Sequence, residues 1–146
     1  MNNKEISLLL MENMGNFRSL IKTINAQRYS KDKILTETQF FVLISLEKHR
    51  KIELKNLSKE LVVSTSSLCI LLNKLVEQDY VYREEDARDR RNTFYGITKK
   101  GEETINSEVH KFASIVSEKF DNINEEEIQK LVCSLSEITG IVKKLF

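Results

Sequence analysis

The apolar residues between positions 54 and 97 change their spacing once, and this change limits the folds that the chain can adopt. Up to about residue 78 they recur three and four positions apart, which predicts a short helix over roughly 54–61 and a second helix with Ser64 as its N-cap. The segments "YVYRE" and "NTFYGI" follow, and alternate residues of the latter share one face. The sequence therefore predicts two helices joined by a tight turn and followed by a β-hairpin.

Further helices are predicted on both sides of this segment, and no proline is present to interrupt them. Residues 4–29 and 36–48 form helical patterns, the second with a capping box that starts at Thr36. After the hairpin, Thr98 is placed to cap a long helix, and Asn124 a last one whose first turn carries three glutamates. The predicted fold class is mainly α with a small β-hairpin.

This order of elements is the layout of a winged helix-turn-helix, here predicted over about residues 36–101. In that layout the second helix enters the major groove of DNA and the hairpin reaches the adjacent minor groove. The charge distribution agrees, because residues 1–101 carry a net charge of +5 and residues 102–146 a net charge of −4, within a total of +1. The first part of the chain is therefore expected to meet a polyanion.

The stretch "EEDARDRRNTFYGITKKG" supplies the tip of the predicted hairpin. Arg88, Arg90 and Arg91 lie there, and a guanidinium suits the narrow, strongly negative minor groove. Asp86 and Asp89 are expected to pair with neighbouring arginines and to hold the shape of the loop. The alternative is a solvated surface hairpin of mixed charge, but its position directly after a helix-turn-helix favours DNA contact.

The second helix of the motif offers hydroxyl groups rather than a basic residue at its start. These can meet bases or phosphates, and the candidates are Ser64, Thr65, Ser66 and Ser67. Ile70 is a candidate for contact with a thymine methyl group, or else a core residue at the edge of the helix. Lys74 is a candidate phosphate contact, or else a solvated lysine.

Residues 57–101, "LSKELVVSTSSLCILLNKLVEQDYVYREEDARDRRNTFYGITKKG", resemble the core of the MarR family of bacterial transcription regulators. The helix-turn-helix, the "DARDRR" wing and the "ITKKG" that opens the next helix carry the resemblance. The flanking helices extend it to a single MarR-type domain over residues 1–146. It implies a homodimer that binds pseudo-palindromic double-stranded DNA, in many members a repressor released by a small, often aromatic, effector. Val62 and Asp79 stand where the family usually has glycine.

The end helices, about residues 4–30 and 102–146, are the predicted dimerisation elements. Their apolar seams are too regular for one small domain to cover, and an uncovered stripe would make the monomer sticky. The predicted interface residues are Leu10, Phe17, Leu131, Leu135, Ile138, Val142 and Leu145. A two-fold dimer would set two recognition helices about 34–36 Å apart. The alternative is that the seams close an internal bundle.

A candidate effector pocket is expected between the dimer helices and the DNA-binding lobe. Its candidate walls are aromatic: Phe17, Tyr29, Phe40 and Phe41. At helical spacing such aromatics also serve simply as core residues, and no ligand is named by the sequence.

Other functions have less support in the sequence. His49 and His110 fall in no catalytic motif and no glycine-rich phosphate loop is present, so we expect no enzyme and no cofactor. Cys69 and Cys133 lie far apart, which predicts no metal site and structural roles for both thiols. Without a signal peptide or a membrane span, the expected location is the cytoplasm. The remaining competitor is a winged-helix protein-interaction module that does not bind DNA.

Overall fold

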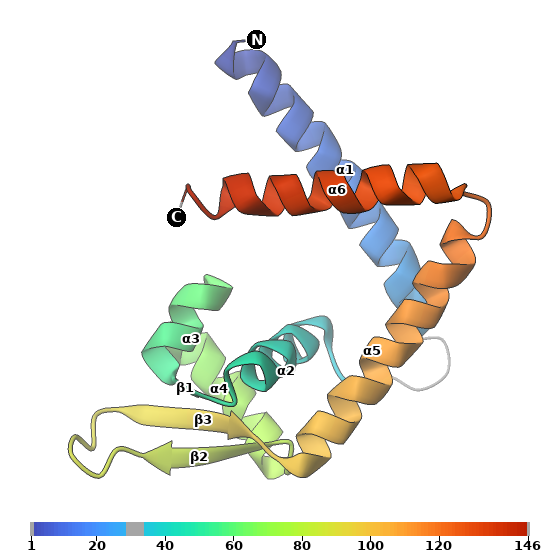
Figure 1. Ribbon diagram of the computed structural model, residues 1–146. Helices are drawn as coiled ribbons and strands as arrows, with labels where there is room; N and C mark the ends of the chain where they lie inside the picture. The colour runs from blue at the N-terminus through green and yellow to red at the C-terminus, as the bar shows by residue number, and fades with distance from the viewer. Residues whose placement is uncertain (1, 29–33, 146) are drawn as a thin grey trace. The chain divides into compact units, whose positions relative to one another are not determined.

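The computed structural model describes residues 2–28 and 34–145, which form six helices and three strands. Their order along the chain is shown in Figure 1. The bounds are α1 Asn3–Arg28, α2 Glu37–His49, β1 Lys51–Glu53, α3 Leu54–Leu61, α4 Thr65–Glu77, β2 Val81–Glu85, β3 Thr93–Ile97, α5 Lys99–Phe120 and α6 Glu125–Val142. The fold is mainly helical, as predicted.

The chain divides into two units. Residues 29–111 form the winged-helix unit, and residues 1–28 together with 112–146 form the end-helix unit. Helix α5 starts in the first and ends in the second. Among the described residues, no helix combines the length and the apolar character that a membrane span requires.

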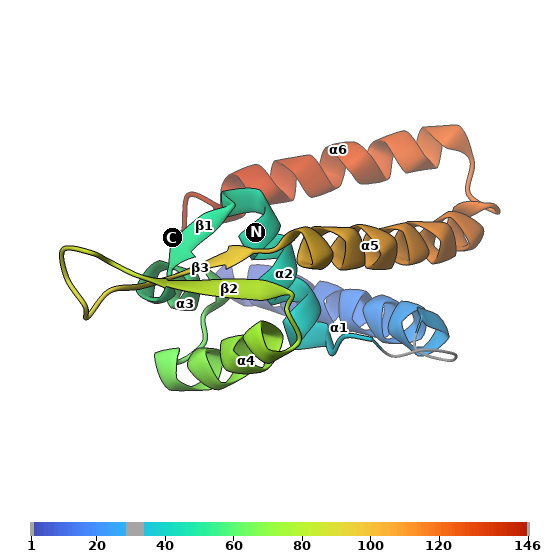
Figure 2. The same ribbon diagram turned by 90° about the horizontal axis from the view of Figure 1, so that it is seen from below.

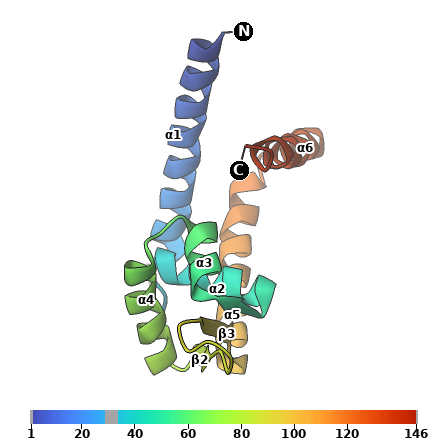
Figure 3. The same cartoon turned by 90° about the vertical axis from the view of Figure 1, so that its left-hand side faces the viewer.

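The helix-turn-helix of the winged-helix unit is made by α3 and α4, which lie against each other (Figure 3). Helix α3 ends at Leu61, and its C-cap residue Val62 adopts a left-handed backbone with φ 53° and ψ 44°. The backbone N–H groups of Val62 and Val63 donate to carbonyls in the last turn of the helix. Ser64 then caps α4, as predicted, by accepting a hydrogen bond from the backbone N–H of Ser67. A β-branched residue at positive φ is unusual. The turn nevertheless keeps the geometry that a glycine would give it.

The sheet has three strands rather than the predicted two, in the order β1-β3-β2. Both pairs are antiparallel, and β1 adds to β3 with Lys51 opposite Gly96 and Glu53 opposite Phe94. The predicted hairpin is confirmed as β2 and β3. Strand β1 was not predicted, because three residues are too few to show an alternating pattern. Figure 2 shows the loop between β2 and β3 projecting from the sheet as a wing. Asp79, before β2, has φ 62°, so it serves the turn that a glycine usually makes.

The core of the winged-helix unit collects the apolar faces of its helices and sheet. Its buried members are Leu35, Val42, Leu43, Leu46, Leu57, Leu68, Leu72, Leu75, Val81, Tyr95, Ile97 and Ile105. Helix α4 contributes three of these residues, Leu68, Leu72 and Leu75, so its apolar side faces the core. A capping box begins α2 at Thr36, as the sequence predicted. Asn124 caps α6, also as predicted, and the structure adds a reciprocal contact from Glu127 that completes a capping box there.

The end-helix unit leaves most of its apolar side chains exposed. Helix α6 has no buried residue in the part of the chain that the structure describes. The exposed residues of the predicted seams include Leu10, Phe17, Leu135, Ile138, Val142 and Leu145, whereas Leu131 is partly buried. One open groove of about 790 Å³ lies along α1 and also touches Ile138 of α6. Within this unit, therefore, the seams do not close an internal bundle.

Candidate nucleic-acid interface

One face of α4 is exposed, and it is opposite the face that packs into the core. Leu68, Leu72 and Leu75 are buried, whereas Ile70 is 63% exposed and Lys74 is exposed. Ile70 is therefore not a core residue at the edge of the helix, which was the alternative left open by the sequence. The outer face of the recognition helix can meet a ligand as large as DNA.

The hydroxyl groups at the start of α4 divide into two pairs. Ser64 and Ser67 are engaged with each other, because the Ser64 Oγ accepts from the Ser67 backbone N–H at 3.2 Å and donates to the Ser67 Oγ at 2.9 Å. Thr65 and Ser66 lie between these two serines in the chain, and both side chains are exposed. The cap fixes the start of the helix, and the direct reading of bases by Thr65 and Ser66 stays a prediction.

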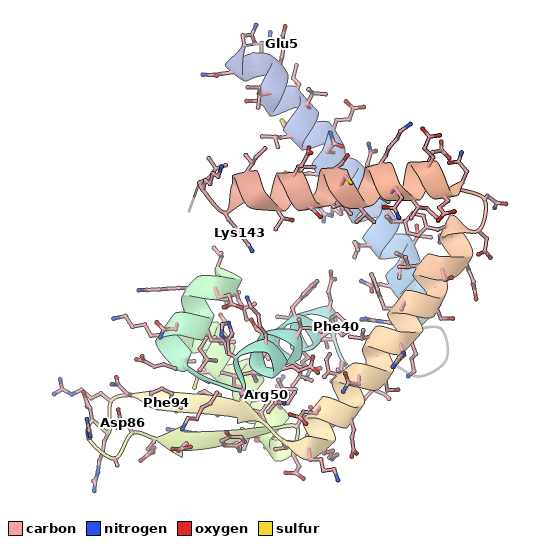
Figure 4. The ribbon with its side chains drawn as sticks, viewed as in Figure 1. Glu5, Phe40, Arg50, Asp86, Phe94 and Lys143 are labelled. Atoms are coloured by element: carbon pink, nitrogen blue, oxygen red, sulfur yellow. The ribbon has the colours of Figure 1, made fainter. Side chains whose placement is uncertain are left out.

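The tip of the wing is a structured loop. The Asp86 backbone N–H donates to the Asn92 carbonyl at 3.0 Å, and the Asn92 N–H donates to the Asp89 carbonyl at 2.9 Å. The carboxylate of Asp86 accepts from the backbone N–H of Arg88 at 2.9 Å, and that of Asp89 accepts from the N–H of Arg91 at 3.0 Å. Asp86 is labelled in the loop in Figure 4.

These contacts change the expected role of the two aspartates. They were expected to pair with arginine side chains, but their carboxylates accept backbone N–H groups, as short polar side chains do in tight turns. Arg88, Arg90 and Arg91 are all exposed. The loop can therefore hold its shape through its backbone while the guanidinium groups point to solvent.

A second contact holds the root of the wing and was not predicted. The Lys51 Nζ on β1 lies 3.2 Å from the Glu84 Oε1 on β2 and 5.6 Å from the ring centroid of Phe94 on β3. Lys51 thus touches both other strands, and the Phe94 side chain is labelled on β3 in Figure 4. The contact depends on the pairing of β1 with β3. It could not be predicted, because the sequence pattern did not indicate a strand at β1.

Cys69 joins the recognition helix to the central strand. Tyr95 on β3 is only 1% exposed, and burial raises the pKa of its hydroxyl; the neighbouring half-buried Cys69, to which this hydroxyl donates a hydrogen bond, raises that pKa further. Cys133 is exposed on α6. Within residues 2–28 and 34–145, no three His, Cys, Asp or Glu side chains gather as a metal site would require.

Glu60 braces α3 against α2. Its carboxylate accepts a hydrogen bond from the Ser45 hydroxyl and lies 2.6 Å from the His49 Nε2. The hydrogen bond from Ser45 is the main cause of a lowered pKa for Glu60, and His49 adds to it, while partial burial opposes it. Because α3 positions the turn before α4, these contacts between α3 and α2 help to fix the position of the recognition helix.

Replacing Glu60 with glutamine is expected to destabilise the fold at neutral pH by about 1 kcal/mol, because charge-assisted hydrogen bonds are lost. The folded-state pKa of Glu60 lies below the ordinary value of a glutamate side chain, about 4.5. Its stabilising effect is therefore complete above that value and is lost as the pH falls through the folded-state pKa. Urea unfolding from pH 7 to pH 3 should show the two proteins converging. The control is Glu103→Gln, whose side chain is 70% exposed and should change stability little at any pH. A pH-independent difference for Glu60→Gln would contradict the assignment.

The aromatic residues predicted to form an effector pocket lie at different places. Phe41 is 51% exposed, packs edge-to-face on Phe40 at 5.7 Å, and lines a groove of about 470 Å³ between α2, α3 and α4. Phe17 lines the groove of the end-helix unit. Tyr29 lies outside the described residues. A shared pocket for these side chains stays a prediction.

Comparison with known proteins identifies the architecture. Residues 35–93 match the sequence profile of the MarR family. The HTH-type transcriptional regulator SarZ of Staphylococcus aureus (strain MRSA252) is 34% identical over 107 residues, which cover 73% of this chain and 71% of SarZ. The chain belongs to the MarR family. SarZ of Staphylococcus epidermidis is similar as well, at 33% identity over 104 residues.

Solved structures show the same fold for this MarR-family chain. The transcriptional regulator BldR from Sulfolobus solfataricus has a TM-score of 0.73 at 23% identity, covering 96% of this chain and 99% of BldR. FabT of Streptococcus pneumoniae, solved in complex with DNA, has a TM-score of 0.70 at 23% identity, covering 99% and 100% of the two chains. The named relatives are regulators rather than enzymes, which agrees with the expectation from the sequence.

Proposed function

We propose that this MarR-family regulator acts as a homodimer that recognises a pseudo-palindromic DNA operator. The observation that carries the proposal is the winged-helix unit, which combines an exposed, capped recognition helix with a braced wing whose arginines face solvent. The helix supplies a surface for base edges and the wing supplies charge for the minor groove. The FabT complex with DNA supports this use of the fold.

The homodimer is supported by the end-helix unit. Apolar side chains of α1 and α6 are exposed in rows, and exposed rows of this kind mark association surfaces. A two-fold pair would cover them with their symmetry mates and would present two recognition helices to successive major grooves. The operator would then share the two-fold symmetry of the protein.

Repression with release by a small aromatic effector completes the proposal. Its support is the groove beside the edge-to-face pair of Phe40 and Phe41, since grooves with apolar walls and few polar groups suit such ligands. The groove touches α3 and α4 at Leu61 and Ser67. An occupant there would press on the helices that carry the DNA-binding face.

The proposal is tested by selecting bound sequences from a pool of random duplex DNA. We expect enrichment of an inverted repeat whose half-sites are one helical turn apart. A pool that stays random, while the protein remains folded and captures protein partners, would overturn the proposal in favour of an interaction module. A single unrepeated half-site would overturn the dimer and leave DNA binding in place.

A further inference from the structure

The outer face of α4 carries a particular set of side chains beyond its cap. Ser66, Ile70 and Asn73 follow one another at steps of four and three, so they lie on one face, and all three are exposed. Helix α4 contains no arginine, and Lys74 is its single basic residue. Lys74 follows Asn73 in the sequence, so its side chain lies beside this row and not within it.

The chemistry of the row favours A·T base pairs. An asparagine amide can bond both N6 and N7 of adenine in the major groove, and an aliphatic side chain can contact the thymine methyl group. Arginine, which makes bidentate contacts to guanine, is absent from this helix, and Lys74, its one other candidate for a guanine contact, lies beside the row rather than in it. The helix rises about 4.5 Å between residues three apart, close to the roughly 3.4 Å step of a DNA strand. Ile70 and Asn73 can therefore reach neighbouring base pairs.

We propose that Asn73 and Ile70 determine the operator sequence, with the Asn73 amide on an adenine and the Ile70 side chain against the methyl group of a thymine in an adjacent base pair. This inference rests on the proposed function and deepens it. Ser66 and Thr65 lie toward the start of the same helix, and Lys74 contacts a phosphate at the side. The wing also favours DNA rich in A·T pairs, because A·T tracts have the narrow minor groove that attracts Arg88 and Arg90.

The test uses the selected operator with single atoms changed in the DNA. Replacing one thymine at a time with deoxyuridine removes only the C5-methyl group, and replacing one adenine at a time with 7-deazaadenine removes only the N7 acceptor. For the wild type we expect one thymine position per half-site to cost about fourfold in affinity. One adenine position per half-site should cost about tenfold.

Matched protein variants assign these losses to residues. Ile70→Ser should bind the deoxyuridine and thymine duplexes equally, while it still discriminates against 7-deazaadenine. Asn73→Ala should show the opposite pattern. Lys74→Ala should weaken binding to all duplexes by the same factor and reduce the salt dependence by about one counterion per protomer. All three positions are exposed, and circular dichroism can verify that each variant is folded.

The outcomes separate this inference from the proposed function. If the wild type binds no duplex tightly, the proposed function fails. If it binds an inverted repeat, but Ile70→Ser and Asn73→Ala keep the wild-type sensitivity to both altered bases, only the assignment of these residues is overturned. Half-sites whose central positions are all G·C pairs would also overturn it.

Discussion

Replacing Arg88 and Arg90 with alanine is expected to weaken operator binding by about ten- to a hundredfold. Both side chains are exposed on a loop that Asp86 and Asp89 hold through backbone N–H groups, so little ordering entropy is lost when they bind. A dimer would lose four guanidinium groups. The slope of log K against log salt should therefore fall in magnitude by about 3 to 4, because each neutralised phosphate contributes about 0.9. Titrations with operator DNA at several salt concentrations measure both quantities.

A matched control separates the wing from general electrostatics. Lys143→Ala with Lys144→Ala removes the same number of positive charges from the exposed end of the end-helix unit. This variant should change affinity by less than about threefold. Equal losses in the two double variants would mean that net charge, and not the wing, is responsible. An unchanged salt slope after loss of Arg88 and Arg90 would remove the wing from the mechanism.

Replacing Ile138 with glutamate is expected to dissociate the dimer and to reduce operator affinity by about a hundredfold or more. Ile138 is 52% exposed in the single chain, so the substitution leaves the helix intact in the monomer but places a charge in the proposed interface. Loss of the second half-site removes the gain in effective concentration that a dimer provides. Sedimentation equilibrium and operator titration measure the two effects.

Val132 provides the control for this experiment. It lies on the same helix and is also 52% exposed, but it falls outside the three-and-four seam that contains Leu135 and Ile138. Val132→Glu should therefore remain dimeric and bind the operator. If both variants stay dimeric, the proposed interface is wrong. If Val132→Glu alone dissociates, the interface lies on the adjacent face of α6.

Much of the fold follows from local signals in the sequence. Thr36, Ser64 and Asn124 were predicted as helix caps because short polar side chains before an apolar period accept backbone N–H groups, and the structure has all three. Strand β1 was missed, because its three residues have no period of their own and pair with β3 only through the tertiary fold. Local chemistry is visible in the sequence, whereas long-range register is not.

The candidate interface was predictable to a smaller extent. The positions of the wing arginines could be predicted, but the backbone contacts of Asp86 and Asp89 depend on turn geometry that side-chain charge does not reveal. The contacts of Glu60 could not be predicted from the sequence either, because its partners Ser45 and His49 lie on another helix. Asn73, for which we propose a base contact, could be placed from the sequence, since it shares a helical face with Ser66 and Ile70.

The strand order β1-β3-β2 also bears on how readily copies of this regulator would aggregate through their sheets. A sheet ends in strands whose unpaired backbone groups can recruit strands from other molecules. Here one outer strand, β1, has only three residues, and the other, β2, carries Arg83, Glu84 and Glu85 in succession. The short length of β1 and the charges on β2 therefore discourage edge-to-edge pairing between the sheets of neighbouring copies.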